Sequence, residues 1–168
     1  MEIQVIAYVF RSELKSIMSY TDMQGICIKS ARYNRTSHVT GFMIECGGVF
    51  LQALEGPEEA VGSIFRRIVD DRRHHHVDLL LSNEGLRRRQ FGVWALNLMF
   101  LDDPLLWHRV VGSLSSYDDF LERSQDPVFA LGLLSLTYRF ACAATGIDPV
   151  TVGVKRGRIP RARHMLRQ

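Results

Sequence analysis

A single glutamine lies at the centre of an apolar segment, GGVFLQALEGP, which runs from Gly47 to Pro57. Successive side chains of a strand point to opposite faces, so Gln52 shares a face with Phe50 and Leu54. Its amide carries donors and an acceptor, and leaving such a group buried without a partner costs about 1 to 3 kcal/mol. We therefore expect a polar group or ligand to face Gln52, unless the side chain is exposed to solvent or bonds the backbone.

Two further polar residues could take part in chemistry. Tyr8 lies near the end of the first apolar segment, and its phenol is protonated at neutral pH, can hydrogen-bond and can give up an electron together with its proton. Asn34 lies where an amphipathic helix is expected to end. Each also has a purely structural interpretation, Tyr8 as an ordinary strand aromatic and Asn34 as a residue that tolerates the left-handed turn at a helix end.

Two charged clusters suggest other chemistry but support it weakly. The run His74-His75-His76 could bind a metal, but consecutive strand residues point to different sides, so we expect solvated turn residues. The run from Arg87 to Arg89 could bind phosphate, although a charged loop face is commoner. The sequence shows no glycine-rich phosphate loop and no convincing Ser-His-Asp grouping, so it does not favour an enzyme.

Length and composition indicate one globular domain with an appendage. The chain has 168 residues, of which 46% are hydrophobic, and carries a formal charge of +3. Six of its 21 basic side chains fall in residues 155–168, which hold no acidic one, so the body is mildly acidic and the tail basic. We see neither a signal peptide nor a membrane-length apolar run and expect a cytoplasmic protein. The three scattered cysteines should be buried free thiols (Cys27, Cys46 and Cys142).

The elements that must position the polar residues follow from hydrophobic periodicity. Thr21 and Gln24 resemble a capping box at the start of the first helix. The expected order is β-α-β-β-α-β-β, an α+β fold of the ferredoxin-like type with one strand added. The expected strands cover residues 3–10, 38–46, 49–55, 77–82 and 93–100, and the expected helices cover residues 21–34 and 58–68.

A second layer is expected after residue 100. Apolar residues recur at helical spacing between Leu105 and Ala144, with turn signals at Ser115-Ser116 and Asp126-Pro127. The first group of these residues is Leu105, Leu106, Val110 and Val111, and the second is Phe129, Leu133, Leu136 and Phe140. Since the two earlier helices can cover only one face of the sheet, these C-terminal helices should cover the other.

Residues 1–100 resemble the BLUF domain, a blue-light sensor that binds FAD without a covalent link. Several separate motifs carry the resemblance, each in the right order and on the expected element. They are Tyr8, SARYN with Ser30 and Asn34, VTG at 39–41, GGVFLQALEGP, RIVDDRRH at 67–74 and RQFGVW at 89–94.

The resemblance implies roles for particular residues. Tyr8 would donate an electron and a proton to the excited flavin, Gln52 would bridge that phenol to the ring, and Asn34 would bond the ring's pyrimidine edge. Trp94 and Leu96 would relay the signal through the last strand. The remaining expected flavin contacts are Ile26, Ser30, Phe50, Leu54, Arg67, Ile68, Asp71 and His74.

The sequence also departs from the family pattern. Two extra residues separate Tyr8 from Asn34, and Phe10 stands where a serine is common. Tyr33 replaces a polar residue, and Leu96 stands where a methionine is typical. Because that methionine helps to position the glutamine, its replacement bears on signalling more than on flavin binding.

We therefore expect a short blue-light photoreceptor with FAD as its cofactor, an unidentified protein partner and a homo-oligomeric state. Its parts would be a flavin-binding domain (1–100), a helical cap (101–146) and a flexible basic tail (147–168). Two alternatives stay open. One is an interaction module with this fold but no light response, and the other is a ferredoxin-like module that binds nucleic acid through its tail.

Overall fold

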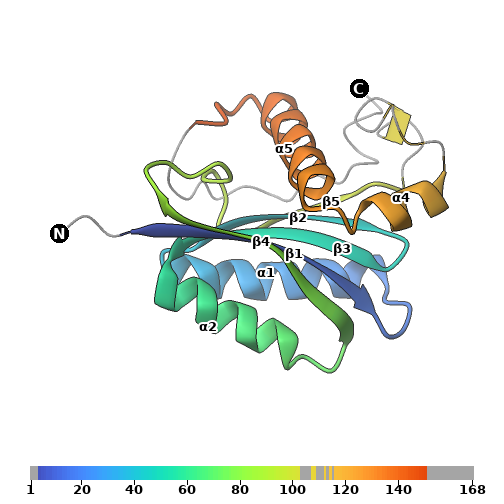
Figure 1. Cartoon of the computed structure of the whole chain (residues 1–168), viewed down its shortest axis with the longest axis horizontal. Helices are drawn as coiled ribbons and strands as arrows, with labels where there is room; N and C mark the ends of the chain where they lie inside the picture. Colours follow the sequence, from blue (N-terminus) through green and yellow to red (C-terminus); the bar gives the residue numbers. More distant parts are fainter. Residues whose placement is uncertain (1–3, 103–106, 109–111, 113, 115, 151–168) are drawn as a thin grey trace.

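A mixed five-stranded sheet lies between two helical layers (Figure 1). The computed structural model describes residues 4–102, 107, 108, 112, 114 and 116–150. The first two helices cover one face of the sheet, and α4 and α5 lie on the other. The elements are β1 (Val5–Leu14), α1 (Tyr20–Thr36), β2 (Thr40–Cys46), β3 (Val49–Pro57), α2 (Glu58–Val69), β4 (His74–Leu86), β5 (Asn97–Phe100), α4 (Tyr117–Arg123) and α5 (Pro127–Ala144).

The strand order is β4-β1-β3-β2-β5, which places the strand of Gln52 at the centre of the sheet. β1 pairs antiparallel with both β3 and β4, and β2 pairs antiparallel with β3. Only the short β5 runs parallel to its neighbour, β2. This arrangement confirms the α+β fold with an added strand, and β2 separates β5 from β3.

The hairpin between β2 and β3 forms because its turn residues are glycines. Gly47 and Gly48 both have positive φ, +57° and +86°, as a tight two-residue turn requires. A Cβ on Gly47 would also lie 2.6 Å from the Tyr117 ring, so the turn has space only for hydrogen at this position. The glycine pair therefore fixes the register that faces Gln52 with Met43 on β2.

Side-chain caps begin three of the helices. Ser19 accepts a hydrogen bond from the Asp22 backbone N–H and starts α1, so the expected capping box at Thr21 is wrong by two residues. Ser116 and Asp126 cap α4 and α5 in the same way, as the turn signals predicted.

β4 and β5 differ most in length from the predicted strands. β4 has 13 residues, and its exposed polar side chains hide the strand from a search for apolar alternation. β5 has only four residues, and the apolar segment 91–96 before it is buried without forming a strand. All three cysteines are buried and free, as expected.

Helix α5 packs one face on the sheet and contacts β1, β2 and β3. Its buried residues include Ala130, Leu134 and Tyr138, while Val128 and Leu136 are exposed. Among the described residues, α5 has the length and composition of a membrane span, a test that core helices of water-soluble proteins also pass. Some expectations concern residues outside the described part of the chain. These are residues 105, 106, 110 and 111 and the basic tail from 151 onward.

Candidate functional site

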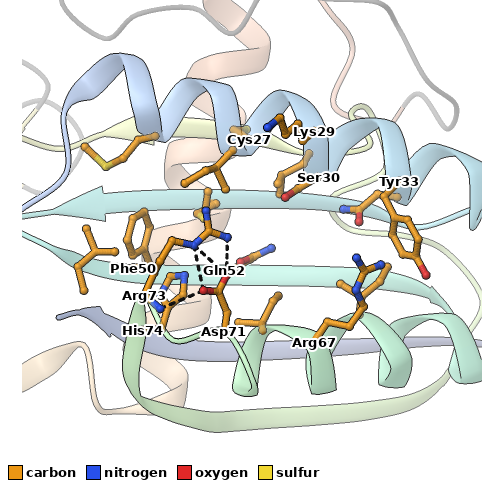
Figure 2. Close-up of a pocket in the computed structure, with 18 of the residues that line it drawn as sticks. Cys27, Lys29, Ser30, Tyr33, Phe50, Gln52, Arg67, Asp71, Arg73 and His74 are labelled. Atoms are coloured by element: carbon orange, nitrogen blue, oxygen red, sulfur yellow. Dashed lines mark hydrogen bonds and ion pairs between the residues drawn. The ribbon is translucent and has the colours of Figure 1, made fainter. Parts of the chain in front are cut away.

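A cavity of about 350 Å³ lies between helices α1 and α2 and the sheet (Figure 2). Its walls are largely apolar, with polar and charged side chains at the sheet and around its rim. Ten residues predicted for the site line this cavity, namely Ile26, Ser30, Asn34, Phe50, Gln52, Arg67, Ile68, Asp71, His74 and Leu96. The sequence did not single out the others, which are Leu14, Met18, Met23, Cys27, Lys29, Tyr33, Met43, Ile64 and Arg73.

Gln52 forms part of the cavity floor. Its side chain is only 8% exposed, and its amide has no hydrogen-bonding partner within the part of the chain that the structure describes. Because the amide lines the cavity and bonds none of the described protein groups, its N–H and carbonyl are available to a polar ligand. Figure 2 shows Gln52 between the two helices, with Phe50 two positions along the same strand.

The register of β1 against β3 places Phe10 directly across from Gln52. Tyr8 lies two pairs further along and is opposite Leu54. The Tyr8 ring packs edge-on against Phe65, with centroids 5.5 Å apart, and is not among the residues that line the cavity. The structure therefore does not bring Tyr8 beside Gln52, although the two residues share a face of the sheet.

Two other predicted residues lie outside the cavity. Leu54 is fully buried in a small core beneath α2 together with Phe10 and Ile64. Trp94 is buried on the opposite face of the sheet, where its ring centroid is 5.7 Å from that of Tyr138 on α5. Leu96, two residues after Trp94, does line the cavity.

Asn34 connects the cavity to the segment before β5. Its side chain is 2% exposed, and Nδ2 donates a 2.9 Å hydrogen bond to the Ala95 carbonyl. On the other face of the same segment, the Val93 N–H donates to the Tyr138 hydroxyl at 3.2 Å. Residues 93–96 thus contact both the cavity wall and helix α5.

An ion pair and a histidine form one rim of the cavity. Arg73 donates to Asp71 through Nε at 2.9 Å and also through Nη2, and this bonding lowers the pKa of Asp71 to about 2. Burial lowers the pKa of His74, whose Nδ1 lies 3.3 Å from the Ser12 hydroxyl. The rim therefore holds an ionised carboxylate beside an imidazole that favours its neutral form.

A thiol and three basic side chains complete the cavity. Burial raises the pKa of Cys27 to about 12, so this thiol stays protonated and unreactive at neutral pH. Lys29, Arg67 and Arg73 bring positive charge to the walls, and the Arg67 guanidinium lies 4.3 Å from the Tyr33 ring centroid. The arrangement can hold a flat apolar ring group that carries polar edges and negative charge.

Two buried charged residues outside the cavity were missed from the sequence. Glu55 accepts hydrogen bonds from the Gln90 and Phe91 backbone N–H groups, at 2.9 and 2.7 Å. Arg11 donates from Nε to the Ser124 hydroxyl at 3.0 Å and so joins β1 to the end of α4. Both charged groups hold loops on the sheet, and neither gives a motif that the sequence alone would reveal.

Comparison with known proteins gives consistent results. Residues 5–97 match the family model BLUF, described as sensors of blue-light using FAD. The chain is 34% identical over 93 residues to the blue light- and temperature-regulated antirepressor BluF of Escherichia coli, covering 55% of this chain and 23% of that protein. It is 33% identical over 91 residues to the photoactivated adenylate cyclase subunit alpha-like protein FB of Euglena gracilis, covering 53% of this chain and 9% of the relative.

Solved structures show the same fold. The dark-state structure of BlrB, a BLUF protein, superposes with a TM-score of 0.68 at 20% identity, covering 82% of this chain and 97% of that one. A bacterial light-regulated adenylyl cyclase gives a TM-score of 0.65 at 24% identity, over 89% of this chain and 42% of that one. In the two sequence relatives, by contrast, the matched region covers a quarter or less of the protein, 23% of the Escherichia coli antirepressor and 9% of the Euglena gracilis protein.

Proposed function

Because the chain belongs to the BLUF family of sensors of blue light using FAD, we propose that it holds the flavin ring in the cavity between α1, α2 and Gln52. FAD is the cofactor by which this family senses light, and the bound ring would supply light absorption and redox chemistry. The unpartnered amide of Gln52 is the observation that carries the assignment of the site.

The residues around the cavity fit such a group. Ile26 on α1 and Ile68 on α2 both line the cavity and offer apolar surfaces to a flat ring, while the amides of Gln52 and Asn34 can hydrogen-bond its polar edge. The cavity volume of about 350 Å³ suits the ring and part of its side chain, with the remainder of FAD outside. Lys29 and Arg67 could neutralise its phosphates.

The light reaction is proposed to use Tyr8 and Gln52. An amide can present either its N–H or its carbonyl to a ring, so a rearranged Gln52 changes the hydrogen bonding of the flavin with little movement. Tyr8 would donate the electron and proton. It is a diagonal neighbour of Gln52 across β1 and β3, and side chains at such positions lie about 7 to 8 Å apart, within reach of long side chains.

One observation favours a second candidate function. Phe10, which has no hydroxyl, takes the place directly across from Gln52, and Leu96 lines the cavity where a methionine was expected. A chain of this kind could bind FAD and contact a partner without a reversible light response. This candidate differs from the first only in the photocycle, so one measurement separates them.

The test is a light-minus-dark absorption spectrum of the purified yellow protein. A reversible red shift that disappears in Gln52→Leu with FAD still bound supports the light sensor. The matched control is Gln90→Leu, because Gln90 bonds Ser135 away from the cavity and its loss should leave the shift unchanged. An unshifted wild-type spectrum with bound FAD selects the second candidate, and absence of bound FAD refutes the proposed site.

We further propose that the output is contact with another protein, with no enzymatic step in this chain, in the cytoplasm and as a homo-oligomer. The exposed Val128 and Leu136 on α5 support a contact surface, and the burial of the opposite face of α5 supports a water-soluble protein. The basic residues 155–168 would attract an acidic protein or, less favoured, nucleic acid. Partner binding that weakens with salt, and loses this dependence when 155–168 are deleted, would assign the contact to the tail.

A further inference from the structure

Glu13, His75 and His76 converge at the paired ends of β1 and β4. Glu13 faces His75 directly across the two strands, and its Oε2 lies 3.2 Å from His75 Nε2. The His75 and His76 ring centroids are 4.6 Å apart. One potential ligand atom from each of the three residues lies within 4.8 Å of the others.

A bulge in β4 produces this convergence. Between the pairs Arg11–Asp78 and Glu13–His75, β1 advances by two residues and β4 by three, so β4 carries one extra residue. His76 takes a positive φ of 46° there. In a regular strand His75 and His76 would point to opposite faces, and the bulge is the feature that the sequence analysis did not foresee.

We propose that Glu13, His75 and His76 form a binding site for a divalent transition-metal ion, with zinc the best fit. Two imidazoles and one carboxylate are a usual ligand set for zinc, with water completing a tetrahedron. Bonds of about 2.0 to 2.2 Å place tetrahedral ligand atoms roughly 3.3 to 3.6 Å apart. The Glu13–His75 pair already has about this separation, and both histidines are exposed enough to rotate inward.

Arg11 orients the carboxylate. Its Nη1 donates a 2.7 Å hydrogen bond to Glu13 Oε1, and its Nε is held by Ser124, so the guanidinium is fixed on the side away from His75. The other oxygen, Oε2, is the one that faces His75. The ion would therefore bind Glu13 through Oε2 alone, with Arg11 as a positioning residue that supports the metal ligand.

The site lies on the reverse side of the cavity wall. His74, the residue before the histidine pair, lines the cavity together with its strand partner Leu14. Glu13 instead shares a face of β1 with Arg11, which bonds the end of α4 on the other side of the sheet. The metal site and the flavin site are thus separate, and the metal proposal does not depend on flavin binding.

The experiment is calorimetric titration of Zn²⁺ into the full chain without a purification tag. We expect one saturable site per chain. Glu13→Gln, His75→Ala and His76→Asn should each weaken zinc binding, raising the dissociation constant by about tenfold or more. Asparagine is chosen at 76 because it tolerates positive φ. The matched control is His108→Ala, which removes another exposed histidine and should bind zinc like the wild type.

Thermal unfolding provides a second measurement. A ligand that binds only the folded state raises the melting temperature, so Zn²⁺ should raise that of the wild type and of His108→Ala, but much less that of Glu13→Gln. Melting in EDTA shows whether each variant is folded. Wild-type protein without saturable binding, or three site variants that bind as tightly as the control, would overturn the proposal.

Discussion

Moving the phenol by two residues along β1 tests the geometry around Gln52. Phe10 faces Gln52 across β1 and β3, while Tyr8 is displaced by two residues and packs against Phe65. The double variant Tyr8→Phe, Phe10→Tyr keeps one phenol and places it beside the amide. Directly opposed side chains have Cβ atoms about 4.5 to 5.5 Å apart, against about 7 to 8 Å for diagonal ones.

The energetic consequence can be measured with a cycle of variants. Phe10 is 1% exposed, so a hydroxyl added there and left unpaired would cost about 1 to 3 kcal/mol. A hydrogen bond from this hydroxyl to Gln52 contributes about 0.5 to 1.5 kcal/mol to the stability and so offsets part of this cost. Urea unfolding of Phe10→Tyr, Gln52→Leu and the combined variant should therefore give a coupling free energy near 1 kcal/mol.

The spectroscopic outcome decides the argument. We expect Tyr8→Phe alone to retain FAD and lose the reversible red shift, and the double variant to regain it with a larger amplitude than the wild type. A double variant that binds FAD, shows no shift and has zero coupling between positions 10 and 52 would refute the expectation that a phenol directly across from Gln52 can replace Tyr8 as the donor.

Three further predictions concern the segment that joins the cavity to the helical layer. Asn34→Ala should lower the free energy of unfolding by about 1 to 3 kcal/mol in urea, because the Ala95 carbonyl loses its bond to the side chain. Burial raises the pKa of Glu55, so the folded state binds the proton more tightly than the unfolded state does. The stability of the wild type relative to Glu55→Gln should therefore fall as pH rises from about 4.5 through the raised pKa, and melting temperatures measured across this pH range check it. Illumination should change hydrogen exchange over residues 93–102 and 116–144, and equal protection in dark and light would exclude this route.

The sequence was sufficient for elements whose signals are local. The glycine pair specified the β2–β3 hairpin, and Ser116 and Asp126 specified the starts of α4 and α5, because turns and caps depend on neighbouring residues only. Ten of the predicted site residues also line the cavity, since the motifs place them on α1, β3, α2, the start of β4 and the adjoining segments.

The sequence was insufficient where long-range pairing decides the structure. Alternation shows that Tyr8, Phe10 and Gln52 lie on strands, but which residue faces Gln52 depends on the register between β1 and β3. The β4 bulge that unites His75 and His76 likewise appears only when two strands are paired. Hydrophobic patterns carry no information about either.

Segment 91–96 was predicted in part as a strand and instead lies between the cavity and the helical layer without forming one. Its apolar residues resemble a strand, and its backbone accepts one hydrogen bond from the Gly41 N–H of β2. Its other backbone bonds go to side chains from three different elements, Glu55 on β3, Asn34 on α1 and Tyr138 on α5. Two of these bonds lie on opposite sides, one at the cavity and one beneath the helical layer. We propose that a change at the cavity wall reaches α5 through residues 93–96, with Leu96 at the cavity end, because side-chain bonds can exchange partners at less cost than a full strand ladder. Equal hydrogen exchange of residues 93–102 in dark and light would contradict this route.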